Sequence, residues 1–218
     1  MRAQPTFFDF AAEVGLTKHI GGLKATDRLI ELCHIHEASF VLDVGCGVGM
    51  TPVYLAKKCR CRVLAVDISE RMVERARERV TRERLRETVD VRVADAQDLP
   101  LGHDTFDAVI TESVTSFPQD KQRAVNEYVR VTRPGGHVGL TESVWLKVPP
   151  PPEVVAWAAQ AILHRYGSVE ALRVLWRMLS LYSKSPAYRN FVKATRQTGI
   201  TPPNLEEYFG YGLFVGRK

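Results

Sequence analysis

The chain has 218 residues, a formal net charge of +5 and a sequence pI of about 9.1. This length suits one domain with a substantial core, and the sequence contains no run of about 20 apolar residues that could cross a bilayer. The four cysteines lack the spacing of a zinc site or of a redox pair, so we expect free, mostly buried thiols and no metal.

Two helical patterns occupy the first 36 residues. Residues 7–15 are amphipathic, and residues 24–35 carry apolar side chains at the spacing of one helix face. Asp9 and Glu13 interrupt the first apolar stretch, which therefore does not resemble a signal peptide. We expect the region 1–36 to form N-terminal helices that cover a ligand cleft in the sheet predicted below.

The stretch VLDVGCGVGM, residues 41–50, is the strongest signal in the chain. An apolar strand contains Asp43 near its end and then gives way to Gly45, Gly47 and Gly49. Glycines at alternate positions permit a sharp turn and the close approach of a ligand. The spacing departs from the Gly-x-Gly-x-x-Gly fingerprint, in which a pyrophosphate lies on a helix N-terminus. The pattern therefore favours a nucleotide-type cofactor without phosphates.

Later strands also end in polar residues. The strand at 61–67 ends in Asp67, 24 residues after Asp43, where a carboxylate can accept hydrogen bonds from a ribose diol. Asp95 and Ala96 lie just beyond the next alternating stretch. A fourth strand covers residues 106–113, and a Pro-Gly-Gly turn precedes a fifth.

The alternation of strands and helices from residue 40 to residue 143 predicts an α/β fold. We expect a doubly wound, mostly parallel sheet with helices on both faces, of the Rossmann-like kind. Ligands in such sheets bind at the carboxyl ends of the strands. The acids predicted to surround one crevice there are Asp43, Asp67, Asp95, Glu112 and Glu142.

Residues 70–87 concentrate Glu and Arg at helical spacing. A solvated helix face with ion pairs between successive turns explains this run without a nucleic-acid partner.

The character of the chain changes after residue 145. A proline-rich stop is followed by three helical stretches over residues 150–200, which we interpret as a lid over an acceptor pocket. Its apolar and aromatic residues are either plain core or the lining of that pocket, and His164 and Tyr166 are candidate acceptor contacts. The stretch 200–204 is too short and proline-broken for a strand, so the sheet has seven strands or only six.

The order of these motifs resembles that of the class I S-adenosylmethionine-dependent methyltransferases, within them the small-molecule branch called methyltransferase type 11. The resemblance covers residues 38–145 and the last segment YFGYGLFVGRK, which is similar to the family's final antiparallel strand. It implies a single methyltransferase domain over 1–218 that binds S-adenosyl-L-methionine, with S-adenosyl-L-homocysteine as the product.

The resemblance also implies roles for single residues. The methionine part of the cofactor would lie near Asp43 and the glycines 45, 47 and 49, the ribose hydroxyls at Asp67, and the adenine at Asp95 and Ala96. Ile68 and Met72 either line the adenine pocket or belong to the core. Lys18, His19 and Gly22 would contact the cofactor carboxylate from above, or else form a linker.

One tetrapeptide, Thr-Glu-Ser-Val, occurs at 111–114 and again at 141–144. If both glutamates face one crevice, Glu112 and Glu142 would repel each other unless a cation joined them or one took up a proton. We therefore hypothesise that they accommodate an amine-bearing or cationic acceptor, or that one acts as the catalytic base. The alternative is that they cap helices or pair with arginines.

The sequence thus predicts a cytoplasmic enzyme that methylates a small organic acceptor, either amine-bearing or hydrophobic. Three other interpretations stay open: an RNA or DNA methyltransferase, a nicotinamide-dependent oxidoreductase, and a cofactor-binding protein without activity. The basic charge is the one feature that favours nucleic acid, and neither a base-flipping motif nor an appended nucleic-acid module is recognisable.

Overall fold

The computed structural model describes residue 19, residues 21–145 and residues 209–218. Nearly all of these belong to one of two compact units of the chain, the one that comprises Thr17–Ser143 and Tyr211–Lys218. The expected lid at 150–200 lies outside the described residues, as do residues 1–18 and the stretch 200–204.

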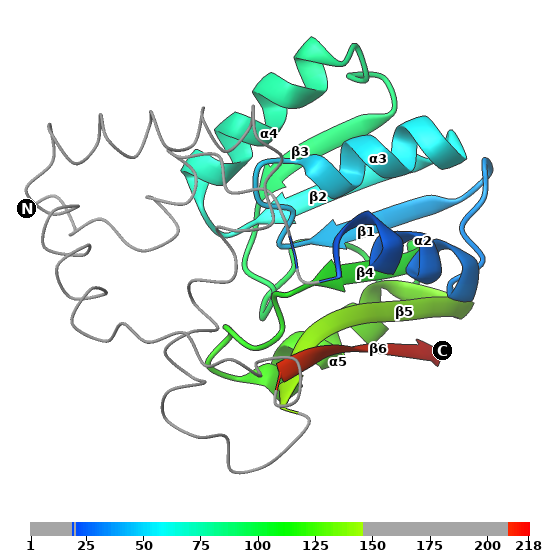
Figure 1. The fold of residues 1–218 in the computed structure, drawn as a ribbon, viewed down its shortest axis with the longest axis vertical. Coiled ribbons are helices and arrows are strands. Elements are labelled where there is room, and N and C mark those ends of the chain that lie inside the picture. Colours follow the sequence, from blue (N-terminus) through cyan, green and yellow to red (C-terminus); the bar gives the residue numbers. More distant parts are fainter. Residues whose placement is uncertain (1–18, 20, 146–208) are drawn as a thin grey trace, which may run out of the picture. The chain divides into compact units, whose positions relative to one another are not determined.

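The described residues form a six-stranded sheet in the order β3-β2-β1-β4-β5-β6 (Figure 1). β1 pairs in parallel with β2 and β4, β2 with β3, and β4 with β5, whereas β6 is antiparallel. The strands are β1 (Phe40–Val44), β2 (Arg62–Asp67), β3 (Val89–Val93), β4 (Phe106–Glu112), β5 (Thr132–Trp145) and β6 (Phe209–Arg217). This confirms the predicted α/β class, the six-stranded alternative and the antiparallel last strand.

Within the described ranges, four helices cover the two faces of the sheet. They are α2 (Gly22–Leu32), α3 (Met50–Cys59), α4 (Glu70–Arg82) and α5 (Lys121–Val131). α2, α3 and α4 lie on one face and α5 on the other (Figure 1). No helix in the described part of the chain is long and apolar enough to span a membrane.

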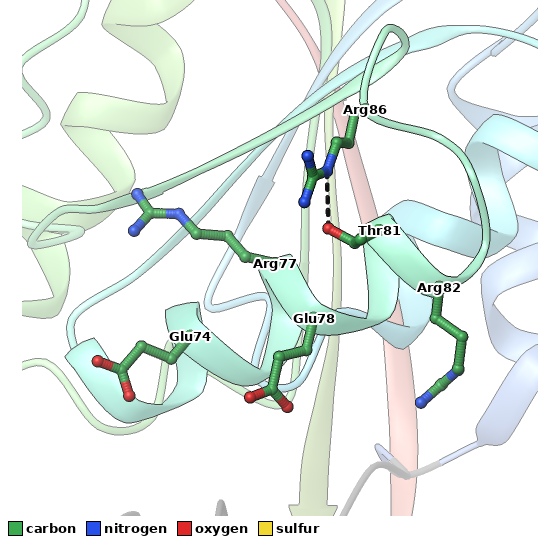
Figure 2. Close-up of a pocket in the computed structure, with 6 residues that line it drawn as sticks. All are labelled: Glu74, Arg77, Glu78, Thr81, Arg82 and Arg86. Atoms are coloured by element: carbon green, nitrogen blue, oxygen red, sulfur yellow. Dashed lines mark hydrogen bonds between the residues drawn. The ribbon is translucent and has the colours of Figure 1, made fainter.

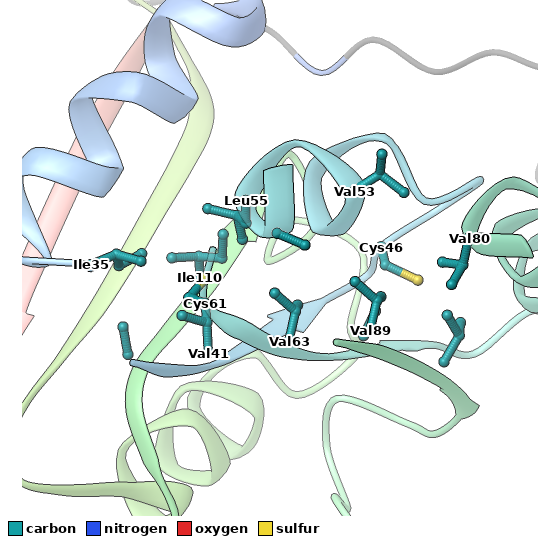
Figure 3. Packing of buried hydrophobic residues seen from close by; sticks show 14 of the residues in the cluster. Ile35, Val41, Cys46, Val53, Leu55, Cys61, Val63, Val80, Val89 and Ile110 are labelled. Carbon is teal, nitrogen blue, oxygen red and sulfur yellow. The ribbon is translucent and has the colours of Figure 1, made fainter. Parts of the chain in front are cut away.

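Two apolar cores result from the alternation of side chains along the strands. The core on the α3 side contains Val41 and Ile110 from the sheet and Leu55 from α3 (Figure 3). The core on the α5 side contains Leu42 and Val109 from the same strands. Because β1 and β4 are covered on both faces, their sequences are almost continuously apolar up to the point where the site begins.

Local signals explain where the helices begin. Ser69 caps α4, its hydroxyl accepting a hydrogen bond from the Met72 amide at 3.4 Å, and the Asp120 carboxylate caps α5 through the Arg123 amide at 2.9 Å. α3 begins differently, because Gly49 precedes it in the left-handed conformation that glycine adopts without steric cost. The glycine loop therefore leads directly from β1 into α3.

Candidate cofactor site

The three glycines of the loop after β1 have different surroundings. All have positive φ, at 75° for Gly45, 53° for Gly47 and 80° for Gly49. A Cβ at Gly45 would lie 2.3 Å from Cγ2 of Val114, and one at Gly49 would lie 3.0 Å from Ala76, so both positions need glycine for packing. A Cβ at Gly47 would meet none of the described residues within 4 Å. Gly47 therefore exposes its backbone to open space, as a ligand cradle requires.

Three acids converge on the same face of the sheet at the carboxyl ends of adjacent strands. Asp43 of β1 stands opposite Ala65 of β2 and Ile110 of β4. Asp67 and Glu112 lie two residues farther along those strands, and side chains two residues apart point to the same face. The three carboxylates therefore occupy the end of the face that α2, α3 and α4 cover.

Asp67 ties the glycine loop to the end of β2. Its Oδ2 accepts a hydrogen bond from the Gly47 amide at 2.9 Å, and its Oδ1 accepts one from the Ser69 amide at 2.9 Å. Burial raises the pKa of Asp67, and these backbone hydrogen bonds oppose the rise. A carboxylate oxygen accepts more than one hydrogen bond, so both oxygens retain capacity for a ligand's hydroxyls.

Asp43 is almost fully buried, with 2% of its surface exposed. Its Oδ2 has no hydrogen-bond partner among the described residues. Burial raises its pKa well above the ordinary value, and the nearby carboxylates of Glu112 and Asp67 raise the pKa further. An orphaned buried carboxyl oxygen is rare, and a hydrogen-bond donor such as a ligand ammonium or a water accounts for it.

Glu112 is also buried, and hydroxyls from two helices contact it. Thr51 of α3 donates to its Oε2 at 2.7 Å, and Thr26 of α2 donates to its Oε1 at 3.0 Å. Nε2 of His19 lies 3.4 Å from the same Oε2. Burial raises the pKa of Glu112, while His19 and the two hydroxyls oppose the rise. Glu112 therefore joins α2, α3 and β4 at the predicted cleft.

The structure does not bring the two glutamates of the repeated tetrapeptide together, which corrects the expectation of a shared crevice. In the β4–β5 pairing, Glu112 stands opposite Thr141, and Glu142 lies one residue beyond this partner. Because an offset of one residue turns a side chain to the other face, Glu142 points to the α5 side. Its Oε1 accepts hydrogen bonds from the amides of Val114 at 2.9 Å and Thr115 at 2.5 Å.

The predicted adenine contacts lie beyond β2 and β3. The Asp95 carboxylate accepts a hydrogen bond from the Gln97 amide at 2.9 Å, and Ala96 packs at the edge of the α5-side core. The Ile68 side chain is 64% exposed, next to Asp67, while Met72 is buried in α4. Ile68 is therefore free to contact a ligand, and Met72 acts as a core residue.

Of the residues predicted to approach the cofactor from above, the structure describes two. Gly22 begins α2 with a φ of 57°, and a Cβ there would meet no atom of the part of the chain that the structure describes within 4 Å. His19 lies against Glu112 and Thr26. Lys18, His164 and Tyr166 lie outside the described residues.

Thr26, Thr51 and Val114 were missed by the sequence analysis. A threonine that interrupts the apolar side of a helix, as Thr26 does, was the available signal for a buried polar contact. Among the described residues, no group of three or more His, Cys, Asp or Glu side chains is arranged to hold a metal, and all four cysteines are free.

A separate surface hollow is lined by residues of α4 and by Arg86, which follows this helix (Figure 2). Charged side chains line it, together with one hydroxyl. The lining residues are Glu74, Arg77, Glu78, Thr81, Arg82 and Arg86. No residue of the glycine loop and none of the three convergent acids belongs to it, so we do not assign the cofactor there.

Strand order 3-2-1-4-5, a final antiparallel strand and a glycine loop after the first strand define the fold of the class I methyltransferases. A protein from Thiobacillus denitrificans described as a SAM-dependent methyltransferase in complex with S-adenosyl-L-homocysteine shares it with a TM-score of 0.72, at 17% identity and 97% coverage of each chain. The [4+2]-cyclase SpnF also shares it, with a TM-score of 0.73, 19% identity, and coverage of 97% of this chain and 93% of the cyclase.

Residues 42–140 match the family described as "Methyltransferase domain". This match covers a little less than half of the chain, and it supports the resemblance of the sequence motifs to the class I S-adenosylmethionine-dependent methyltransferases.

Three relatives show how far the similarity extends. Methyltransferase GfsG of Streptomyces halstedii is 37% identical over 56% of this chain and 44% of the relative. The 27-O-demethylrifamycin SV methyltransferase of Amycolatopsis mediterranei is 34% identical over 59% of this chain and 46% of the relative. Ajmaline N-methyltransferase of Rauvolfia serpentina is 30% identical over 71% of this chain and 56% of the relative. The matched part of the chain thus spans about half the length of these relatives.

Proposed function

We propose that the protein transfers the methyl group of S-adenosylmethionine to a small organic acceptor. The single observation that carries this proposal is the open space above Gly47, next to three carboxylates that converge on the same face. A cofactor with two cationic centres and a ribose diol fits such a site, whereas a pyrophosphate would be repelled by it.

Each acid then has a distinct part in binding. Asp67, already fixed by the Gly47 and Ser69 amides, accepts hydrogen bonds from the ribose hydroxyls. The orphaned Oδ2 of Asp43 accepts a hydrogen bond from the cofactor's ammonium, directly or through a water. Glu112 contributes negative charge at the same end of the cleft, where a second carboxylate favours a cation.

The cofactor supplies an activated methyl group, and the chain has to hold an acceptor in line with it. Correct orientation of this sort is worth roughly 7–11 kcal/mol, so a dedicated base is not required. Glu112 is the better of the two predicted catalytic candidates, because Glu142 faces the other side of the sheet. We assign Glu112 to binding or proton acceptance next to the cofactor.

The named relatives support a small-molecule acceptor. Their names refer to 27-O-demethylrifamycin SV and to N-methylation of ajmaline. An amine-bearing or hydrophobic acceptor remains our proposal for this chain, with the region 150–200 as the expected lid over it.

The test is transfer of labelled methyl from S-adenosylmethionine into a panel of amines, phenols, quinones, thiols and macrocyclic natural products. We expect a labelled product in one class and none with Asp67→Asn, which loses a ribose acceptor. RNA and duplex DNA form separate arms, where labelling that falls steeply with salt would favour a nucleic-acid substrate instead. If the protein binds the cofactor but methylates no acceptor in any arm, the site would serve a reaction other than methyl transfer. The similar fold of a [4+2]-cyclase is a precedent for another reaction on this architecture.

A further inference from the structure

The segment that follows β4 is held in an unusual backbone conformation. Ser113 has a φ of +61°, a left-handed conformation that is unfavourable for a residue with a side chain. Its amide donates to the carbonyl of Thr141 at 2.7 Å. Val114 and Thr115 follow the last residue of β4 that pairs with β5, so their amides need another acceptor.

Glu142 supplies that acceptor. One carboxylate oxygen, Oε1, receives the hydrogen bonds of both the Val114 and the Thr115 amides. The other oxygen, Oε2, is buried and has no hydrogen-bond partner among the described residues. The side chain thus spans from β5 to the segment after β4 and fixes two successive backbone groups.

Val114 carries this constraint to the cofactor loop. Its side chain fills the space in front of Gly45 so completely that a Cβ there would come within 2.3 Å of Cγ2. Gly45 in turn donates to the Val66 carbonyl at 2.7 Å and leads to Gly47. If Val114 moves, the glycine loop therefore loses this packing contact or is displaced, and the position of Gly47 changes with it.

We propose that Glu142 is a positioning residue for the cofactor site, in which its carboxylate holds the backbone at Val114 and Thr115 so that Val114 fixes the loop at Gly45. Glu142 does not touch the acceptor and is not a base. This inference rests on the proposed function only for the identity of the ligand that the loop binds.

The key experiment compares Glu142→Gln with Glu142→Ala. The Gln side chain retains an oxygen that can accept both amides, while its charge is lost. We therefore expect Glu142→Gln to keep affinity for S-adenosylhomocysteine within about threefold, and Glu142→Ala to lose about tenfold or more, since two buried donors lose their acceptor. If Glu142 acted through its charge, Glu142→Gln would weaken binding as much as Glu142→Ala; if it acted only as a base, neither variant would weaken binding. Either result would overturn the proposal.

A double-mutant cycle tests the route through Val114. Val114→Ala alone should weaken S-adenosylhomocysteine binding, and adding it to Glu142→Ala should cost little more, because both changes release the same contact. Full additivity of the two losses would contradict the route. If Glu142→Ala does not fold, Glu142→Leu replaces it in the cycle. If neither variant folds, Val114→Ala is compared with Glu142→Gln. In that comparison we expect Val114→Ala to weaken binding and Glu142→Gln to leave it nearly unchanged.

Amide hydrogen exchange separates this inference from the proposed function. The Val114 and Thr115 amides should be protected in the wild type and in Glu142→Gln, and should exchange faster in Glu142→Ala, whatever ligand the protein binds. Unchanged protection in Glu142→Ala would overturn the proposal that Glu142 fixes this backbone. If Glu142→Ala loses protection but the wild type does not bind S-adenosylhomocysteine, the role of Glu142 would be supported and the proposed function contradicted.

Discussion

Gly45 and Gly47 are two residues apart, yet only Gly47 faces open space. Gly47→Ala should keep the fold at a cost of about 1–2 kcal/mol from its positive φ, and should block the approach of the cofactor. Gly45→Ala, whose Cβ would overlap Val114, should lower stability by more than that. Urea unfolding and S-adenosylhomocysteine titration of both variants measure the two effects.

The prediction for these glycines has a clear contrary outcome. If Gly47→Ala binds S-adenosylhomocysteine as tightly as the wild type, the space above Gly47 is not the cofactor cradle. If Gly45→Ala is as stable as Gly47→Ala, the packing of Val114 against the loop is looser than described.

The buried carboxyl of Asp43 makes stability depend on pH. Burial and two neighbouring carboxylates raise its pKa in the folded protein, so the folded state holds the proton more tightly than the unfolded state. Its contribution to stability therefore declines as pH rises from the ordinary carboxyl pKa of about 4 toward the raised value. Asp43→Asn removes this decline.

Without ligand, we expect the melting temperature of Asp43→Asn to increase relative to that of the wild type as the pH rises from about 4 to 7. Thermal unfolding followed by circular dichroism across this range measures the difference. Parallel curves for the two proteins would show that Asp43 titrates as an exposed acid does and that its burial is overstated.

At the scale of the elements, a pair of side chains on α5 holds the segment that leads to β4. Arg130 donates to the carbonyls of Leu101 at 2.8 Å and Leu99 at 2.9 Å, and Glu127 accepts from the Leu99 amide at 2.8 Å. The two side chains also pair with each other, since Nε of Arg130 lies 2.7 Å from Oε1 of Glu127. The planar guanidinium is suited to reach two carbonyls at once.

Arg130→Ala should cost about 1–3 kcal/mol of unfolding free energy, because two partly buried backbone acceptors lose their donor. Arg130→Lys should recover only part of it, since a single ammonium cannot reproduce the fork. Arg28→Ala, which removes an exposed ion pair with Glu31 on α2, is the control and should cost less than about 0.5 kcal/mol. Equal losses at positions 28 and 130 in urea unfolding would refute the role of Arg130.

Helices and strands were predictable where composition and spacing act locally. The alternation after residue 40 predicted the α/β class, and the glycines marked the turn from β1 into α3. The charged run at 70–87 predicted α4, although the structure ends this helix at Arg82 and uses Arg77 and Arg79 to bind the carbonyls of Val91 and Val48. Long-range contacts of this kind leave no local pattern.

The site was predictable in part for the same reason. Asp43, Asp67 and Glu112 end or nearly end their strands, and the rule for carboxyl ends places them at one edge. The face on which each side chain lies depends on register, so the one-residue offset that separates Glu142 from Glu112 was not readable from the repeated tetrapeptide. The hydroxyl of Thr26 reaches Glu112 across 86 positions of sequence.

For the molecule as a whole, the comparisons support a methyltransferase domain over residues 42–140, and the activity is our proposal. The fold is shared with a methyltransferase and with a cyclase, so architecture does not select the reaction. What selects it is whether the glycine loop and the three acids together bind S-adenosylmethionine and its product.

Calorimetric titration of the full chain with S-adenosylhomocysteine, with NAD as the comparison ligand, tests this most directly. We predict one site for S-adenosylhomocysteine, no heat with NAD, and an affinity for S-adenosylhomocysteine at least about tenfold weaker in Asp67→Asn, which replaces a charged hydrogen-bond acceptor at the ribose. A folded wild-type chain that does not bind S-adenosylhomocysteine, or that binds NAD in its place, would contradict the account.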